Sequence, residues 1–570
     1  MPAYSETAGA VDGEEPTAAP GAGDGRLLAG GAQGAAALRP LTSVVLDALA
    51  EGAVRRCGPL PAGGPARVAE LVRAAMGGAP TPEVPEHGAG SGEALRSLAG
   101  LLAEGAADPA DPLCAAHLHC PPLAVAAAAE LAAGALNPSL DSWDQAPAAS
   151  ELESWTCRAL AALVYGARGG GDGSGGEERA DAVDGTDAAA GTDGADGTDG
   201  ADGPVQVPEA VVTTGGTEAN QLAALLARER YGTGVRIVCG ANSHHSVRRS
   251  AWLLGLPEPL VVPTPRGVLA PGALRESLAP LAAASRGPAL VVATAGTTDT
   301  GAVDPLPELA DVAREFGSRL HVDAAYGGPL LFSDRLRPLL AGLERADSVA
   351  VDLHKLGWQP VAAGLFVVPD RSALDPLGHR ADYLNAEDDT EAGLPDLLWR
   401  SLRTTRRPDV FKVAVTLRAL GRSGLGALVD RTRDAALRLA ELVAADPRFE
   451  LYAPPPLTTV LFRPSGADDA TVAAVRRRLL SEGSAVLGRA APEAARAPAA
   501  PGADPDAGDA GGRAKLWLKA TLLNPYAQPA DLAGLLKLVR EAADAVEADT
   551  GARPLTGTGT APSAERSGRP

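Results

Sequence analysis

Short apolar runs begin to recur along the chain at about residue 209. They are rich in β-branched residues, and stretches of helical spacing separate several of them. The runs are "EAVVTTGG", "VRIVCG", "ALVVATAG", "RLHVDAA", "SVAVDLH" and "GLFVVP". Strands that alternate with helices indicate an α/β fold, with a mostly parallel central sheet covered by helices. Such a sheet binds its ligands at the carboxyl ends of its strands.

The segments around this sheet are expected to be helical or disordered. "LTSVVLDALAEGAVRRC" has helical spacing and starts the ordered structure, and helices dominate again after about Thr405. We therefore predict a disordered N-terminal tail, a helical N-terminal arm, a large domain, a small α+β C-terminal domain and a second disordered tail. These parts span residues 1–40, 41–107, 108–410, 411–548 and 549–570.

Two low-complexity segments interrupt these domains. Residues 169–203 repeat the unit "GTDGAD" without an apolar face, which indicates a disordered acidic insert. Residues 489–512 are rich in Pro, Ala and Asp and are predicted to be a second insert. The formal net charge of −20 argues against nucleic acid as a partner, although the acidic insert supplies much of that charge.

The cysteines and the N-terminus indicate the cellular compartment of the protein. The five cysteines are scattered and contain no CxxC pair, which favours neither a disulfide framework nor a metal site. The N-terminus is acidic and lacks the apolar core of a signal peptide. No uninterrupted apolar run of about 18 residues is available to span a membrane. We expect a reduced, soluble, cytoplasmic protein without a membrane partner.

Several strand ends carry residues whose chemistry goes beyond packing. "VVTTGGTEANQ" joins a strand to a helix through two glycines, so backbone N–H groups and the positive end of the helix dipole can meet an anion. An ordinary helix cap at Thr217 is the alternative. His244 and His245 follow another strand. Asp323 ends a further apolar run, where a buried carboxylate needs a cationic partner, either an arginine or a ligand.

Lys355 follows the next apolar run, in "SVAVDLHKLGW". It is one of only five lysines, in a chain that otherwise uses arginine for its basic residues. A lysine amine in a dry pocket can form an imine with a carbonyl compound, which a guanidinium cannot do. An anion cradle, a carboxylate and an imine-forming lysine together fit pyridoxal 5'-phosphate, because its phosphate, ring nitrogen and aldehyde need these three groups.

The motifs resemble those of the group II pyridoxal-phosphate-dependent amino-acid decarboxylases. The resemblance runs from about Asp108 to Leu538 and includes "NPSLDSWDQ", "TTGGTEAN", "SHHSV", "ATAGTTDTGAVDP", "HVDAAYGG" and "DLHK". A narrower similarity, to L-2,4-diaminobutyrate and siderophore-type lysine/ornithine decarboxylases, rests on "WDQAPAA", "ADYLN", "SLRTTRR" and "LKATLLNP". The resemblance implies the fold of PLP-dependent transferases, fold type I, and a homodimer with active sites at the interface.

The resemblance also implies roles for individual residues. Lys355 would hold the cofactor covalently, and Asp323 would pair with its pyridinium nitrogen. His244, rather than His245, would stack on the ring and protonate the product. These three are the expected catalytic residues, and no metal ion is expected. Further contacts to the cofactor are implied for Gly216, Thr217, Thr298, Ala325 and His354, and a contact to the substrate carboxylate for Arg406.

The expected activity is α-decarboxylation of an L-amino acid to the amine and carbon dioxide. We expect a basic aliphatic substrate, such as 2,4-diaminobutyrate, ornithine or lysine. The acidic stretch Asn385–Gly393 could accept its distal ammonium, although such a stretch is more commonly a solvated loop. The alternatives are an aromatic-amino-acid decarboxylase, an aldehyde-forming deaminase on the same fold, or a cofactor-free binding protein. Asp352 departs from the family pattern, which often has Asn beside the phosphate.

Overall fold

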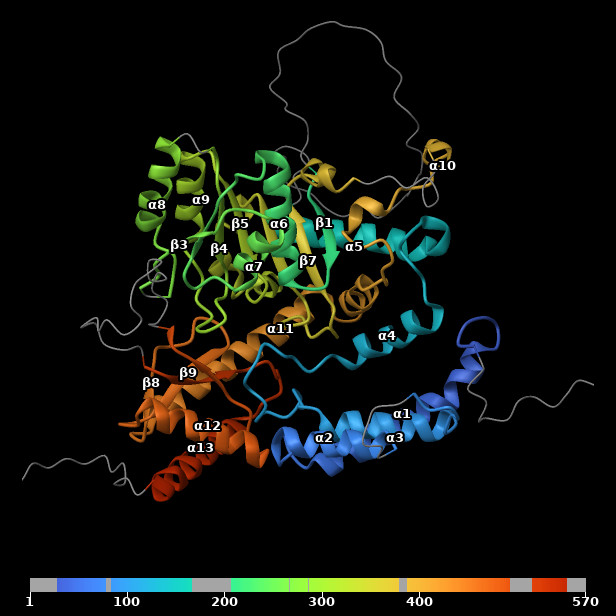
Figure 1. Cartoon of the computed structure of the whole chain (residues 1–570), viewed down its shortest axis with the longest axis vertical. Coiled ribbons are helices and arrows are strands. Elements are labelled where there is room, and N and C mark those ends of the chain that lie inside the picture. The colour runs from blue at the N-terminus through green and yellow to red at the C-terminus, as the bar shows by residue number, and fades with distance from the viewer. Residues whose placement is uncertain are drawn as a thin grey trace, which may run out of the picture. The chain divides into compact units, whose positions relative to one another are not determined.

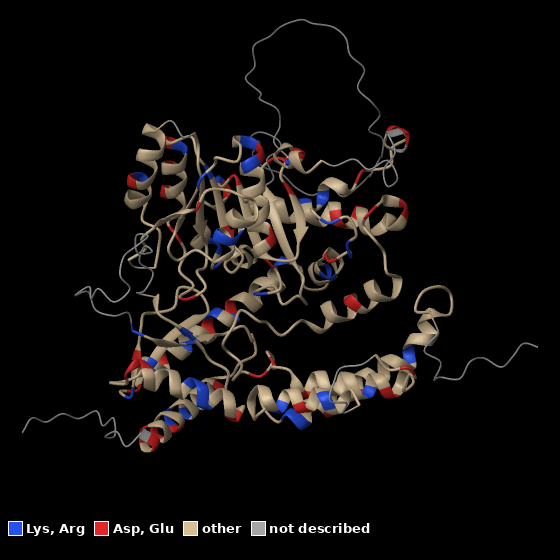
Figure 2. Cartoon of the chain, in the orientation of Figure 1, with Lys and Arg blue, Asp and Glu red and all other residues tan. Residues whose placement is uncertain are grey.

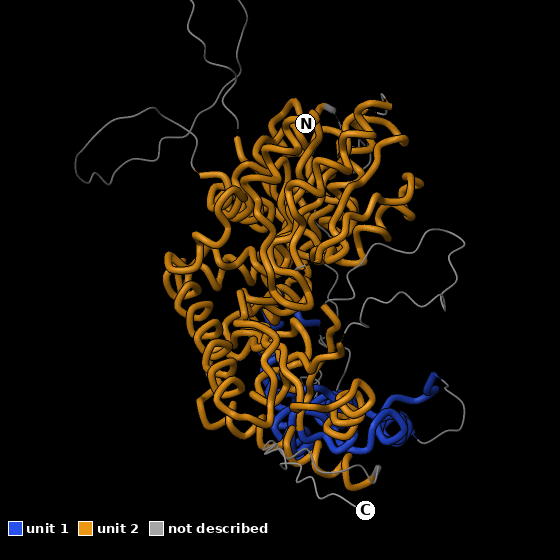
Figure 3. The backbone as a smooth tube through the Cα atoms, turned by 90° about the vertical axis from the view of Figure 1, so that its left-hand side faces the viewer, with its two compact units in different colours: residues 1–107, 481–484 blue, residues 108–480, 485–570 orange. Residues whose placement is uncertain are grey.

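The computed structural model describes residues 28–77, 84–166, 207–265, 267–284, 287–378, 387–492 and 515–550. The predicted acidic insert lies outside the described residues, and so do most of the second predicted insert and most of both predicted tails. The chain forms two compact units, which Figure 3 colours separately. Unit 1 comprises residues 1–107 and 481–484, and unit 2 comprises residues 108–480 and 485–570.

The described part of unit 1 contains helices α1 (Gly34–Arg56), α2 (Gly64–Ala75) and α3 (Ser91–Gly105). Helix α1 begins earlier than residue 41, where the arm was predicted to start. Helices α1 and α3 approach closely because a glycine faces the contact: a Cβ atom on Gly52 would lie 2.4 Å from the Gly100 carbonyl oxygen. Arg55 Nε donates to Glu104 Oε2 at 2.7 Å across the same pair of helices.

Unit 2 contains the predicted sheet, whose strands β1, β3, β4, β5 and β7 are labelled in Figure 1. The strand order is β1-β7-β6-β5-β4-β2-β3. The strands from β6 to β3 in this order are parallel to one another, and β7 is antiparallel to both of its neighbours. This arrangement confirms the predicted α/β fold class. The short strand β3 was not predicted. The strands are β1 (Glu209–Thr213), β2 (Ile237–Gly240), β3 (Leu260–Val262), β4 (Leu290–Thr294), β5 (Arg319–Ala324), β6 (Ser348–Asp352) and β7 (Gly364–Val368).

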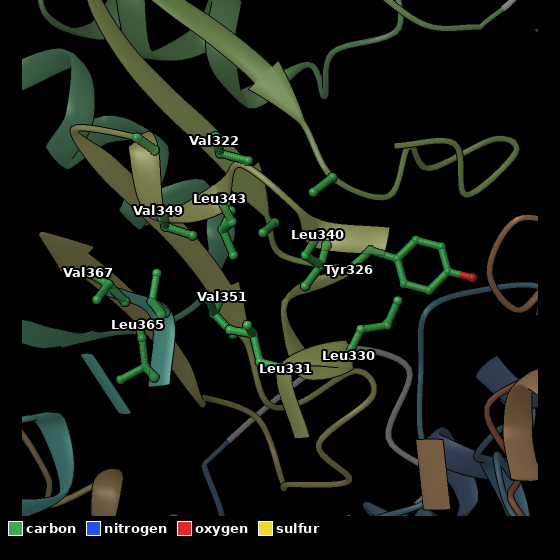
Figure 4. Close-up of a cluster of buried hydrophobic side chains, with 14 of the residues drawn as sticks. Val322, Tyr326, Leu330, Leu331, Leu340, Leu343, Val349, Val351, Leu365 and Val367 are labelled. Atoms are coloured by element: carbon green, nitrogen blue, oxygen red, sulfur yellow. The ribbon is translucent and has the colours of Figure 1, made fainter. Parts of the chain in front are cut away.

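Apolar clusters cover both faces of this sheet. Alternate residues of a strand point to opposite faces, so Val349 and Val351 pack in one cluster and Ala350 packs in the other. Figure 4 shows part of the first cluster, including Val349 and Val351. The first cluster also includes side chains from α5, α8 and α9. The second cluster includes side chains from α6 and α7. These helices are α5 (Pro147–Tyr165), α6 (Gly216–Tyr231), α7 (Ser246–Leu253), α8 (Pro271–Ala283) and α9 (Leu306–Glu315).

A smaller antiparallel sheet, in the order β10-β11-β9-β8, forms in the C-terminal part of unit 2. Its core contains Phe462 and Leu518, both fully buried, packed with side chains of α12 and α13. Its elements are β8 (Phe449–Leu451), β9 (Thr459–Pro464), α12 (Asp469–Glu482), β10 (Gly488–Ala490), β11 (Trp517–Thr521) and α13 (Pro529–Thr550). The remaining α-helices in the described part of unit 2 are α4 (Ala124–Leu136), α10 (Glu387–Glu391) and α11 (Val410–Ala445), which is kinked at Gly421.

Charged residues of both signs are interspersed along the helices of both units (Figure 2). Within the ranges that the structure describes, no helix is both long enough and apolar enough to cross a membrane.

Candidate active site

A cavity of about 390 Å³ lies in unit 2, beside residues that follow the carboxyl ends of β1, β2, β4, β5 and β6. Parallel strands bring their carboxyl ends to one edge of the sheet, which is why residues far apart in sequence meet here. The eight residues predicted to contact the cofactor all line this cavity. Its walls comprise Leu118, Thr214, Gly215, Gly216, Thr217, Asn242, His244, Thr294, Gly296, Thr298, Asp323, Ala325, Tyr326, Asp352, His354 and Lys355.

The turn between β1 and α6 leaves room only for glycine. Gly215 has a φ of 155°, and a Cβ atom there would lie 2.9 Å from the imidazole of His354. A Cβ atom on Gly216 would lie 2.8 Å from that of Ala325. Helix α6 begins at Gly216, so Thr217 lies within its first turn and is not the N-cap. The glycine backbone at the positive end of the helix therefore borders the cavity.

Lys355 meets a carboxylate in the cavity wall. Its Nζ lies 2.9 Å from Asp352 Oδ2, on a side chain that is only 3% exposed. The other carboxylate oxygen, Oδ1, has no hydrogen-bond partner among the described residues. His354 Nε2 lies 3.6 Å from the same carboxylate, and burial lowers the pKa of this imidazole against the opposing influence of Asp352. In this structure Asp352 therefore serves as the ion-pair partner of the lysine.

Asp323 is buried at the end of β5 and is satisfied by two donors. Its Oδ2 accepts a hydrogen bond from Asn220 Nδ2 at 2.9 Å, and its Oδ1 accepts one from the Ala325 backbone at 3.1 Å. Asn220 Oδ1 lies 2.8 Å from His321 Nε2. Burial lowers the pKa of His321 to about 4, so this imidazole is neutral at pH 7. Its Nε2 then carries the proton that Asn220 accepts, and its Nδ1 accepts from Ser348 at 2.9 Å.

The same asparagine also reaches His244, through a serine. Asn220 Nδ2 donates to Ser246 Oγ at 2.9 Å, and Ser246 Oγ lies 2.8 Å from His244 Nδ1. The hydroxyl proton of Ser246 is therefore directed at Nδ1, which leaves the proton of the neutral imidazole on Nε2. Burial lowers the pKa of His244, and the Asp323 carboxylate opposes this shift. Asn220 thus joins the carboxylate and the histidine that were both predicted as catalytic.

Two side chains tie the cavity to the smaller sheet. Tyr326, in the cavity wall, shares hydrogen bonds between its hydroxyl and those of Thr458 and Thr459, at 2.7 and 3.0 Å. Trp358, three residues after Lys355, donates from Nε1 to the Leu523 carbonyl oxygen at 2.8 Å. The loop that carries the lysine and the turn after β5 are therefore both anchored outside the large sheet.

Arg406 does not line the cavity. Its guanidinium forms two hydrogen bonds with Glu153, at 2.5 and 2.7 Å, and both side chains are 2% exposed. Arg400 lies 3.6 Å from the same carboxylate and 3.5 Å from Glu209. In the described structure the guanidinium of Arg406 is thus occupied by a buried ion-pair network. None of the described side chains of the acidic stretch lines the cavity, and these include Asp388 and Glu391. Residues 385 and 386 and the side chains of residues 387 and 389 lie outside the described part of the chain.

Sequence reasoning missed four residues that shape the site. Asn220, Ser246, His321 and Tyr326 lie within quoted motifs or beside predicted residues, but no role was assigned to them. A signal was present in the sequence: Asn220 is a polar residue one helical turn after the glycines, on the side of α6 that faces the sheet. Its partners are 26, 101 and 103 residues away along the chain, and only the fold reveals them.

Comparison with known proteins gives consistent matches. The family described as "Pyridoxal-dependent decarboxylase conserved domain" matches residues 206–465. The L-2,4-diaminobutyrate decarboxylase of Rhizobium meliloti (strain 1021) is 36% identical over 81% of this chain and 84% of its own length. The crystal structure of the glutamate decarboxylase domain of diaminobutyrate-pyruvate transaminase and L-2,4-diaminobutyrate decarboxylase from Vibrio parahaemolyticus has a TM-score of 0.71 and 28% identity, covering 91% of this chain and 98% of that one. The 4-hydroxyphenylacetaldehyde synthase of Rhodiola rosea shares the fold, with a TM-score of 0.67 and 20% identity over 89% of this chain and 98% of its own.

Replacing Arg406 tests whether it is structural. We expect Arg406→Met to lower the free energy of unfolding by about 3–5 kcal/mol, because Glu153 would remain as a buried carboxylate that has lost its bidentate partner. Arg407→Met is the matched control, since the Arg407 side chain is 54% exposed, and its loss should cost about 1 kcal/mol or less. Urea denaturation measures both values. A stable Arg406→Met variant with a raised KM would instead support the contact to the substrate carboxylate that the family resemblance implies.

Replacing Asn220 tests the hydrogen-bond hub. Asn220→Leu keeps the branching of the side chain at Cγ but removes the amide that donates to Asp323 and Ser246. Each of these hydrogen bonds is worth about 1–3 kcal/mol once the buried partner is left unsatisfied. We expect weaker retention of pyridoxal phosphate and a shifted pH dependence of its visible absorption. Asn220→Asp should be worse, because it places a second carboxylate beside Asp323. Absorption titrations of both variants, with Gln221→Leu as control, measure this. Unchanged affinity and unchanged pH dependence in Asn220→Leu would contradict the role of the hub.

Proposed function

Because the chain belongs to the pyridoxal-dependent decarboxylase family, we propose that it converts a basic aliphatic L-amino acid to the corresponding amine and carbon dioxide. The candidate substrates are 2,4-diaminobutyrate, ornithine and lysine. Similarity to the Rhizobium meliloti enzyme over most of both chains supports the first of these. A cytoplasmic homodimer that binds no nucleic acid is part of the same proposal, on the strength of the family resemblance and the net negative charge.

The residues of the 390 Å³ cavity fit pyridoxal 5'-phosphate. The turn at Gly215 and Gly216 presents backbone and the positive end of α6, as a phosphate requires. Lys355 supplies an amine that can condense with an aldehyde, and Asp323 supplies an anion for a ring nitrogen. The convergence of these three features on one cavity is the observation that carries the proposal. The same convergence disfavours a cofactor-free binding protein, which would not need a glycine turn, a lysine and a carboxylate in one cavity.

The described side chains account for positioning and for proton transfer. When bound, pyridoxal phosphate supplies an electron-accepting ring that stabilises the negative charge left on Cα as carbon dioxide departs. Asn220 and the Ala325 N–H hold the Asp323 carboxylate in place, so its negative charge is available to a protonated ring nitrogen. His244 carries a proton on Nε2 at the cavity wall, and Lys355 Nζ can hold another. Either group can return a proton to Cα after the carboxyl group leaves.

An aldehyde-forming deaminase or an aromatic-amino-acid decarboxylase on the same fold is the second candidate. The chain shares its fold with a 4-hydroxyphenylacetaldehyde synthase. Their sequence identity of 20% is too low to indicate that they catalyse the same reaction. The products separate the two chemistries. A decarboxylase releases an amine and carbon dioxide, whereas the deaminase consumes dioxygen and water and releases an aldehyde, ammonia and hydrogen peroxide in addition to carbon dioxide.

Lys355→Arg should abolish turnover and the visible absorption of the holoenzyme. A guanidinium stays protonated and cannot form an imine with the cofactor. Lys537→Arg is the control, because its side chain is 68% exposed on α13 and its only described ion pair is with Glu541. Absorption spectra and release of carbon dioxide measure the outcome. Near-normal turnover by Lys355→Arg would remove Lys355 from the proposed chemistry.

The substrate class is tested by steady-state kinetics on a panel of amino acids. We expect the highest kcat/KM for one of 2,4-diaminobutyrate, ornithine and lysine, and values at least about tenfold lower for glutamate, L-DOPA and tryptophan, since a mismatched distal group costs 1.4 kcal/mol or more. Quantifying the amine, the aldehyde and ammonia in the same reactions identifies the chemistry. A higher kcat/KM for an aromatic amino acid would overturn the basic substrate while leaving decarboxylation in place.

A further inference from the structure

A second cavity, of about 570 Å³, adjoins the candidate active site and shares three wall residues with it: Asn242, His244 and Thr298. Its remaining walls come from the residues after β2, from Gly267, from the turn after β4, and from residues 491 and 492. A substrate whose α-carbon is held beside Lys355 and His244 would therefore have space for its side chain on the far side of His244 and Thr298. The residues that line this second cavity would therefore determine which substrate side chain is accepted.

Asp299 is the one carboxylate among the described wall residues of this second cavity, and these described residues include neither lysine nor arginine. We propose that Asp299 binds the distal ammonium of the substrate and so selects basic amino acids. This inference rests on the proposed function, and it places the acceptor on the turn after β4 rather than in the acidic stretch 385–393. A distal carboxylate, as in glutamate, would be repelled by the same residue.

The turn that carries Asp299 is held by its own hydrogen bonds. Thr297 Oγ1 and Thr300 Oγ1 lie 2.8 Å apart, and the Gly301 N–H donates to the Thr297 carbonyl oxygen at 2.8 Å. The Ala302 N–H also donates to Thr297 Oγ1 at 3.0 Å. Gly301 has a φ of 73°, and a Cβ atom there would lie 3.1 Å from Leu457. A carboxylate on such a turn is positioned before a ligand arrives, which reduces the entropy lost on binding.

Lys519, the cation beside Asp299, leaves the Asp299 carboxylate available to bind a ligand. Lys519 Nζ lies 3.9 Å from Asp299 Oδ1, beyond hydrogen-bond distance, and donates instead to the Thr298 carbonyl oxygen at 3.2 Å. The Lys519 side chain is 11% exposed and does not line either cavity, whereas the Asp299 side chain is 52% exposed. The distal ammonium of a substrate donates hydrogen bonds, and the carboxylate oxygens of Asp299 can accept them. Lys519 does not have to move to allow this contact.

The test compares substrates that differ only at the distal group. We expect Asp299→Asn to lower kcat/KM for 2,4-diaminobutyrate by about 10- to 100-fold, the effect of losing one charge-assisted hydrogen bond. The value for norvaline, in which a methyl group replaces the distal ammonium, should change by less than about twofold, since it never made that bond. Asp299→Glu should restore part of the preference. Asp311→Asn, at an exposed carboxylate on α9 outside both cavities, is the matched control.

Equilibrium binding gives a readout that is independent of turnover. Calorimetric titration of the holoenzyme with 1,3-diaminopropane, the amine derived from 2,4-diaminobutyrate, should show weaker binding to Asp299→Asn than to the unmodified protein or to Asp311→Asn. Visible absorption should show that all variants retain the cofactor. If the unmodified protein decarboxylates a diamino acid and Asp299→Asn retains both kcat/KM and diamine affinity, this inference fails while the proposed function stands. If no diamino acid is decarboxylated, both fail.

Discussion

A carboxylate buried at the end of a central strand imposes the main constraint on this site. Asp323 is 6% exposed, and Asn220 and the Ala325 N–H provide the donors that it needs. Asn220 lies on α6 and also forms hydrogen bonds with His321 on β5 and Ser246 on α7. The residue that satisfies the buried carboxylate therefore also holds α6 against β5 and α7. The positions of the glycine turn and of His244 then follow, since both are attached to the helices that Asn220 joins.

Much of this arrangement could be predicted from local sequence. Apolar β-branched runs predicted six of the seven strands, and the carboxyl ends of such strands were expected to converge, which is how Lys355 and Asp323 were placed together. Partnerships over long sequence distances could not be predicted in the same way. An arginine in "TTRR" is compatible with a substrate contact or an internal ion pair, and its partner, Glu153, lies 253 residues earlier.

Cofactor chemistry and substrate choice are supplied by different elements in the proposed enzyme. Lys355, Asp323 and the glycine turn belong to the ends of β6, β5 and β1, whereas Asp299 belongs to the turn after β4. A change in that turn can alter the charge of the side-chain cavity without moving the groups that hold the cofactor. Scaffolds of this kind vary specificity through loops while the strands keep the reaction constant.

The anchoring of Tyr326 and Trp358 to the smaller sheet has a consequence for folding as a whole. The cavity keeps its shape only while Thr458, Thr459 and Leu523 are in place, so the C-terminal segment must fold before the cofactor can bind tightly. By mass action, a ligand that binds only this complete state stabilises every part required to form it. The supply of pyridoxal phosphate would then raise the resistance of unit 2 to proteolysis, including segments of this unit that do not line the cavity.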